Sequence, residues 1–513
     1  MNKIMNTNSS DTLSAKRRWT ALLVLSISLF VIVMDMTILI MALPAIVAEL
    51  QATAIEQLWI VDIYSLILAG LIVTMSFLGD RWGRKKILLF GFLIFGVTSL
   101  LILFVTSATQ IIILRGVLGL AGAMIMPTTL SMIRTIFVDA KERAIALSVW
   151  AGITGFGSVL GPIIGGVLLE QFSWHSTFLI NVPIAIIAVI IGSYVLPEYK
   201  TDDPKPFDLM SALLSLMSMM ALVWSIKSFA KEGLTHGLTW TVCLLGIILL
   251  ILFIQRNIRA TAPMLDVLLF KNKIFTAGIL TAMISIFGMS ALILLVTQWL
   301  QLVQGFSPLQ TGLYILPMAI GEISATLLAP WLAKKIGART VIVGGLVISG
   351  VGLVYMWLLP VNFNYSDIVP TLVMVGMGVG SLAVASALIM SSTSVDRASS
   401  AAAIEETVYD LGNVLGIAIL GSIATLVYRA TLNIQSFKIT HLTQSELHYA
   451  NESIANTLTL ANKYNLTHLY TQATKSFNVA LMDTALIGGV GILVTAIVIY
   501  RLIPKNYDIT ENN

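Results

Sequence analysis

The chain consists largely of apolar stretches that follow one another from Thr20 to Ile503, separated mostly by short polar segments. A helix of about 20 apolar residues is long enough to cross the hydrocarbon core of a bilayer. Hydrocarbon offers no water to unpaired backbone groups, so each stretch has to satisfy its own hydrogen bonds as a helix. Only 11% of the residues are charged, against about 25% in soluble domains. We therefore expect an all-α polytopic membrane protein.

We expect fourteen spans, with both termini on one side of the membrane. The first run, Thr20 to Leu43, is too long for the core of a signal peptide and ends without an A-x-A site, so we interpret it as a retained span. Most of the 30 lysines and arginines fall in alternate connections, which the positive-inside rule places in the cytoplasm with the termini. The expected spans are 20–43, 58–79, 87–106, 109–134, 144–170, 176–196, 208–229, 238–254, 274–302, 308–333, 340–360, 367–392, 401–428 and 479–503.

Two short segments indicate an internal repeat. The segment GDRWGRK, from Gly79, closes the second expected span, and AKKIGAR, from Ala333, closes the tenth, so Gly83 and Gly337 occupy matching places. Such a repeat predicts two six-helix halves with two central spans inserted between them. The expected division is a cytoplasmic N-terminus at 1–19, an N-terminal half at 20–196, inserted helices with their loops at 197–273, a C-terminal half at 274–503 and a cytoplasmic C-terminus at 504–513.

The segment 429–478 is too long for a plain connection. Its apolar residues recur at roughly helical spacing on either side of Asn462 to Asn465. We therefore expect a short amphipathic helical hairpin on the extracellular side.

Six carboxylates that fall inside the expected spans are the strongest functional signal. Inserting a charged side chain near the bilayer centre costs about 2.5–3.5 kcal/mol on insertion scales, so acids in the spans indicate a functional role. The alternative for any single acid is that it is neutral, or paired with a base for packing. Arg115 is a candidate partner for one of them, Asp35, whereas Lys227, at the outer end of the expected span 208–229, is counted with the outer segments. The acids expected to have no base are Asp62, Glu322, Glu406 and Asp410, and Glu405 is the sixth acid.

The expected chemistry of unpaired acids is proton/cation exchange. In a low-dielectric setting such an acid favours its protonated form, and it releases the proton when a cation enters beside it. Glu406 and Asp410 lie four residues apart and share a helix face. Glu405 points about 100° away and ranks below them.

Aromatic residues near the acids suit a lipophilic cation, which gains from cation–π contact and from burial of its apolar body. Trp59 lies three residues before Asp62, so its indole is expected on the same helix face as the acid. The alternative for Trp59 is a place in the aromatic belt at the membrane interface. Trp150 and Tyr409 are the other aromatic candidates.

Several function classes are disfavoured. All five histidines map to outer segments, which argues against a membrane metalloenzyme and leaves no metal site expected. There is no G-x-x-x-x-G-K-[ST] motif, so the energy source expected is an ion gradient and no cofactor is needed. The net charge of +4 is a topology signal and does not indicate nucleic-acid binding. The single cysteine, Cys243, allows no intramolecular disulfide.

Four motifs occur in order along the N-terminal half. Asp35-x-Thr37 with Ala42-Leu43-Pro44 lies in span 1, and Arg115-x-x-Leu118-Gly119 lies in span 4. The loop between spans 2 and 3 contributes Gly79, Asp80, Arg81, Gly83, Arg84 and Lys85. The span 5 motif contributes Gly157, Gly161, Pro162, Gly165 and Gly166. Together these motifs resemble those of the fourteen-span drug:proton antiporters of the major facilitator superfamily.

The resemblance implies the major facilitator fold and proton-driven export of lipophilic mono- and divalent organic cations, such as quaternary ammonium compounds, by alternating access. It implies proton coupling at Asp35, Arg115, Glu406 and Asp410, with Asp62, Glu406 and Asp410 as acidic cavity residues. Glu322 matches a position associated with divalent substrates. Asp80 and Arg84 would form a latch between the halves, and the span 5 motif would block leak.

Alternatives from other classes stay open at this point. The chain could export one endogenous metabolite or lipid-like compound, or serve as a non-transporting membrane sensor. An importer is disfavoured by the span 5 motif, and a channel by the repeat. The expected setting is the cell membrane, with lipophilic cations, protons and lipid as partners and a monomer as the working unit.

Overall fold

Helices make up nearly all of the described structure, a computed structural model that describes residues 14–200, 208–233, 235–260, 263, 266–393, 398–432 and 443–504. Within these ranges, 13 helices are long and apolar enough to cross a membrane. The helix α5 (Ala140–Gln171) is 32 residues long and lies against α1, and it completes the expected fourteen. The fold class predicted from the sequence is therefore confirmed.

The N-terminal half contains six spans. They are α1 (Ala15–Leu50), α2 (Ala54–Trp82), α3 (Arg84–Leu101), α4 (Ala108–Ile136), α5, and α6 (Ser176–Leu179) continued by α7 (Asn181–Val195). The inserted pair is α8 (Leu209–Glu232) and α9 (Gly237–Arg259). Only 17% of the apolar window of α9 is buried within the protein, so most of this helix faces lipid.

Three of the six spans in the C-terminal half are interrupted or change their helical pitch. A π-helical turn at Trp299–Val303 ends α10, and two further spans are each divided into two helices. The elements are α10 (Lys273–Gln298), α11 (Pro308–Tyr314) with α12 (Leu316–Ile336), α13 (Ala338–Trp357), α14 (Tyr365–Gly380) with α15 (Leu382–Ser391), α16 (Ala398–Leu432) and α19 (Thr467–Leu502).

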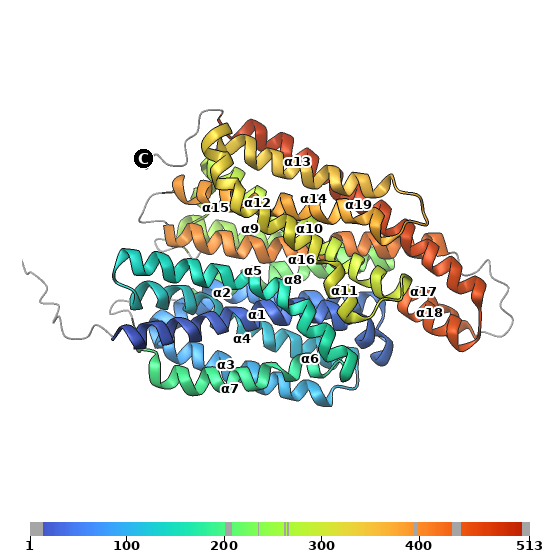
Figure 1. Ribbon diagram of the computed structural model, residues 1–513, viewed down its shortest axis with the longest axis horizontal. Helices are drawn as coiled ribbons and strands as arrows, with labels where there is room; N and C mark the ends of the chain where they lie inside the picture. The colour runs from blue at the N-terminus through green and yellow to red at the C-terminus, as the bar shows by residue number, and fades with distance from the viewer. Residues whose placement is uncertain are drawn as a thin grey trace, which may run out of the picture.

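The two halves lie side by side, with the helices of both running in the same general direction (Figure 1). The helix α1 begins and α19 ends at the left of this view, which we call the terminal end of the bundle. The short helices α17 (Gln444–Glu452) and α18 (Ile454–Lys463) lie at the opposite end, which we call the hairpin end.

Gly83 and Gly337 play the same structural role in the two halves. Each ends one span and begins the next, with φ of +114° and +86° respectively. L-residues with a Cβ rarely adopt this conformation, so glycine is the residue expected at both turns. The shared geometry supports the internal repeat inferred from the two segments.

The extra-membrane hairpin differs from the expected form in its second arm. The helix α19 begins at Thr467 and runs unbroken to Leu502, so the second arm is the extended end of the last span. The first arm is α18, and the turn between them contains Asn465 with φ of +54°. The two arms pack together because both present apolar side chains at helical spacing. Residues 433–442 lie outside the described residues.

Glu446 on α17 stabilises this hairpin. Its carboxylate accepts hydrogen bonds from the Tyr464 hydroxyl at 2.6 Å and from the Thr443 amide at 3.1 Å, and it lies 3.5 Å from the Lys463 ammonium. These partners, with Tyr464 contributing most, lower the pKa of Glu446 to about 2. Arg429 at the end of α16 binds Glu452 at 2.7 Å and ties α17 to the bundle.

The contacts that close the bundle lie toward the hairpin end. The Gly312 segment of α11 packs on the Pro162 carbonyl of α5, where a Cβ at Gly312 would lie 2.8 Å from that oxygen. The Ser307 hydroxyl donates to Glu170 at 2.5 Å, and the Gln301 amide donates to the Met41 carbonyl at 3.1 Å. These contacts join the two halves and seal this end.

Candidate functional site

Asp35 on α1 and Arg115 on α4 form an ion pair in the N-terminal half. Both side chains are 1% exposed, and Arg115 Nη1 contacts Asp35 Oδ2 directly. Asn181 of α7 donates to the other carboxylate oxygen at 3.0 Å, and Arg115 Nε donates to the Ile60 carbonyl at 3.3 Å. The predicted pairing is confirmed. Asn181 was not among the sequence candidates, because nothing in the local sequence indicates that α7 approaches α1 here.

Tyr64 of α2 connects this pair to the C-terminal half. Its ring lies under the Arg115 guanidinium, 4.6 Å from the guanidinium carbon to the ring centroid. Its hydroxyl is buried and has no hydrogen-bond partner among the described residues. The next residue along α2, Ser65, contacts Asn413 of α16 in the C-terminal half. Tyr64 was also missed by sequence reasoning, since its role depends on how α2, α4 and α16 meet.

The glycines of the span 5 motif pack against the α1 turn that carries Asp35. A Cβ at Gly157 would lie 3.1 Å from Val33, one at Gly165 would lie 3.2 Å from Ile38, and one at Gly161 would overlap Thr37. Close approach of the two helices therefore requires small residues, as the motif predicted. Farther along α5, Pro162 and Gly166 contact α11 of the other half. The motif thus fixes α1 and contributes to the seal between the halves.

Asp62 is paired with a base, which corrects the expectation that it would be free. Lys227 Nζ lies 2.8 Å from Asp62 Oδ2, with both side chains at most 1% exposed. The sequence pattern assigned Lys227 to an outer segment, but α8 continues to Glu232 and the lysine side chain is directed into the bundle. The same ammonium lies 4.0 Å from the centroid of the Trp59 indole. Trp59 and Asp62 therefore share a helix face, as predicted.

The acids of α16 fall into two groups. Glu405 is 6% exposed and accepts a hydrogen bond from the Tyr409 hydroxyl at 2.7 Å. Glu406 and Asp410 are half-buried and form no ion pair with any described residue. One oxygen of Asp410 is buried without a hydrogen-bond partner in the described part of the chain. One turn farther on, the Asn413 amide donates to the Ser65 hydroxyl of α2 at 2.9 Å. This contact joins α16 to the helix that carries Tyr64.

Two other candidates lie apart from these groups. Glu322 of α12 is half-buried and has no base partner among the described residues. Its backbone is packed tightly against Gly376 and Gly380 of α14. The Trp150 indole donates to the Thr129 hydroxyl of α4 at 3.2 Å, so its polar edge is directed within the N-terminal half. The structure therefore does not bring all six acids into one cluster.

The loop between α2 and α3 is described in part. The Arg84 guanidinium lies 3.5 Å from the Thr135 hydroxyl and 4.9 Å from the centroid of the Tyr199 ring, both in the N-terminal half. Arg81 is exposed, and the side chain of Asp80 lies outside the described part of the structure. The expected latch between Asp80 and Arg84 stays a prediction.

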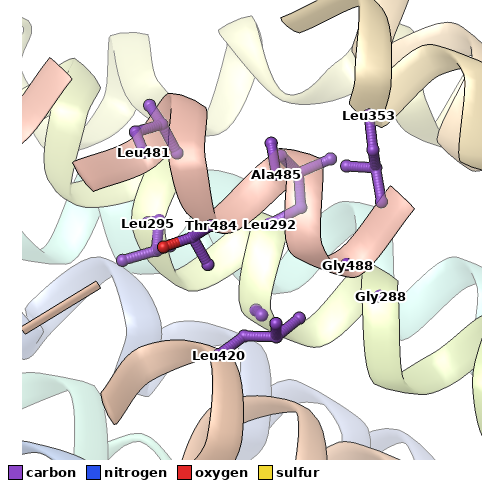
Figure 2. Close-up of a pocket in the computed structure, with 10 residues that line it drawn as sticks. Gly288, Leu292, Leu295, Leu353, Leu420, Leu481, Thr484, Ala485 and Gly488 are labelled. Atoms are coloured by element: carbon purple, nitrogen blue, oxygen red, sulfur yellow. The ribbon is translucent and has the colours of Figure 1, made fainter. Parts of the chain in front are cut away.

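The enclosed cavities are small. Figure 2 shows one of about 10 Å³ in the C-terminal half, where the only oxygen among the labelled side chains is the Thr484 hydroxyl. This volume is about that of one water probe. A second cavity, of about 40 Å³, lies between the halves at the hairpin end beside Gln57 and Gln298. Neither is large enough for an organic molecule, and a third, more open cavity of about 550 Å³ lies beside Asp208 and Arg256. We take the buried carboxylates as the candidate site. Within the described residues, no group of His, Cys, Asp and Glu suits a metal ion.

Comparisons with known proteins identify the family. Residues 25–417 match the model of the Major Facilitator Superfamily. The chain is 39% identical to the "Multidrug efflux pump LfrA" of Mycolicibacterium smegmatis over 96% of this chain and 97% of that protein. It is 33% identical to the "Methyl viologen resistance protein SmvA" of Salmonella typhimurium, over 87% and 90% of the two chains.

A solved structure shares the fold. The bacterial homolog to the human lysosomal transporter Spinster, in an inward-facing and unoccupied conformation, superimposes with a TM-score of 0.67 at 15% identity. The match covers 96% of this chain and 98% of that one. The family model, the relatives and the fold agree. The chain belongs to the major facilitator superfamily of multi-pass membrane transporters, and it is not an enzyme.

Proposed function

We propose that this protein is a proton-coupled antiporter that exports lipophilic organic cations, with Glu406 and Asp410 as the exchange site. The observation that carries the proposal is that these half-buried carboxylates share one face of α16 and have no base partner among the described residues. The helix α16 packs against α2 of the N-terminal half, which carries Tyr64 beside the Asp35–Arg115 pair. Relatives named for multidrug efflux and for resistance to the cation methyl viologen support this choice.

The exchange follows from electrostatics. A carboxylate without a base in a low-dielectric site is stable either protonated or beside a cation, and the two states exclude each other. A bound lipophilic cation therefore displaces a proton, and a returning proton displaces the cation. Glu405 differs because the Tyr409 hydroxyl already stabilises its charge. Glu322 provides a further acid without a base, and we propose that it contributes to binding divalent cations.

Asp35 and Arg115 couple this exchange to the movement of the halves. Protonation of Asp35 would weaken its bond to Arg115. Their helices, α1 and α4, pack on α5 and α2 respectively, and both of these contact the C-terminal half. The contacts that Gln301, Ser307 and Gly312 make across the halves lie toward the hairpin end. The positive-inside rule places the terminal end in the cytoplasm. We therefore propose that this arrangement is closed toward the outside and takes up substrate from within.

Transport by purified protein in liposomes tests the proposal. A proton gradient is imposed and the movement of the monocation tetraphenylphosphonium is followed for the wild type, Glu406→Gln and Asp410→Asn. The matched control is Asp367→Asn, which changes a capping carboxylate at the start of α14. We expect gradient-driven exchange by the wild type and the control, and at least about tenfold slower exchange by each α16 variant. Wild-type protein that moves no cation in either gradient direction would refute the function, and α16 variants with wild-type rates would refute the site.

A further inference from the structure

Lys227 lies at the interface between the two halves, which we call the seam, on a helix that packs against both. The helix α8 packs on α2 of the N-terminal half and on α16 of the C-terminal half, with α9 on its other side. Around this seam, Val223 of α8 forms an apolar cluster with Ile63 and Leu66 of α2 and with Val414 and Ala418 of α16. The Lys227 side chain is 1% exposed, so its ammonium is removed from water.

The ammonium has two partners in the described part of the chain. The Asp62 carboxylate lies 2.8 Å away, and the Trp59 ring centroid lies 4.0 Å away. Both partners come from one face of α2, and Trp59 packs against the apolar cluster. An anion, an aromatic face and an apolar wall are the groups that recognise an organic ammonium ion.

We propose that Asp62 and Trp59 form a cation site whose resident occupant is the Lys227 ammonium, and that a substrate cation enters only when Lys227 withdraws. This inference rests on the proposed export of cations and specifies one binding site for it. A tethered ammonium competes at a high effective concentration, so it outcompetes a free cation of similar intrinsic affinity. Because α8 contacts both halves, a movement of α2 relative to α16 changes the position of Lys227.

The competing interpretation is that the pair only anchors α8. A buried pair can often be replaced by apolar side chains of similar volume without loss of stability, whereas removing one partner leaves an uncompensated charge. The two interpretations therefore predict different results when Lys227 alone is neutralised. A site filled by Lys227 becomes available to a free cation, whereas an anchor merely becomes weaker.

The experiment measures equilibrium binding of tetraphenylphosphonium to purified full-length protein. Lys227→Met removes the charge with little change in volume, and Lys227→Gln retains a hydrogen-bond donor for Asp62. The double variant Asp62→Asn/Lys227→Met removes both partners. The control Arg429→Met breaks the Arg429–Glu452 pair at the hairpin end, away from the seam. Gel filtration and thermal unfolding check that each variant is folded.

We expect both Lys227 variants to bind the cation at least about tenfold more tightly than the wild type. The double variant and the Arg429 control should stay within about twofold of the wild type. Folded Lys227 variants without a gain would overturn the inference, as would Lys227 variants that fail to fold while the double variant folds, because that is the behaviour of an anchor. If the wild type binds and exports the cation but the Lys227 variants gain nothing, only this inference fails. If the wild type neither binds nor exports it, the proposed function fails.

Discussion

Replacing Asp35 with asparagine should destabilise the protein more than replacing Arg115 with methionine. In Asp35→Asn, the guanidinium stays buried and charged without a counterion, and breaking a buried pair in this way costs about 3–5 kcal/mol. Arg115 keeps its hydrogen bond to the Ile60 carbonyl at 3.3 Å and its contact with the Tyr64 ring at 4.6 Å. These remaining contacts favour the lower end, about 3 kcal/mol.

Arg115→Met leaves a carboxyl group that can avoid the penalty by taking up a proton, which a guanidinium cannot do by losing one. Asn181 also continues to donate to Asp35. We therefore expect a loss of about 1–2 kcal/mol, mostly from the hydrogen bonds removed. The double variant should be more stable than Asp35→Asn alone, because the uncompensated charge is gone.

The assay is denaturant unfolding in detergent, followed by the reactivity of Cys243, the single cysteine of the chain and one that is half-buried in α9. The four proteins form a double-mutant cycle, which isolates the energy of the pair. Additive losses would refute the reasoning, because they would mean that the two charges do not compensate each other. A greater loss in Arg115→Met than in Asp35→Asn would refute the predicted asymmetry.

Three further predictions concern packing, backbone strain and pH. Gly161→Ala places a Cβ against Thr37 and should lower the free energy of unfolding by about 1–3 kcal/mol. The control Gly491→Ala, which has open space around it, should leave that free energy unchanged. Equal effects of the two substitutions would contradict the packing argument. Gly83→Ala forces alanine to φ of +114° and should cost about 1–3 kcal/mol, measured in the same way; an unchanged midpoint would exclude strain at this turn. The pKa of Glu446 is lowered to about 2, so its stabilising contribution is complete above the ordinary value of 4.5 and is lost as the pH falls through about 2. Limited proteolysis of the hairpin should therefore accelerate across this range in the wild type and change less in Glu446→Gln; identical profiles would assign the effect to other groups.

Features that depend on the energetics of a short segment could be predicted from the amino-acid sequence alone. The apolar spans follow from the need to bury backbone groups in hydrocarbon, so nearly all of the expected helices could be located without a structure. The turns at Gly83 and Gly337 follow from a conformation that favours glycine. The Asp35–Arg115 pair could be predicted because Arg115 was the base assigned to a span, at a depth similar to that of Asp35.

Features that depend on how helices rotate and pack against each other could be seen only in the tertiary structure. The position of Lys227 near the end of a span predicts an outer residue, yet α8 directs its side chain to Asp62. Tyr64 contacts the Arg115 guanidinium only when α2 packs against α4. A charged side chain inside a membrane is retained only when it is paired or has a function, and the sequence shows which side chains face this requirement. Which partner it finds is set by side-chain directions on neighbouring helices, and those are properties of the packed bundle.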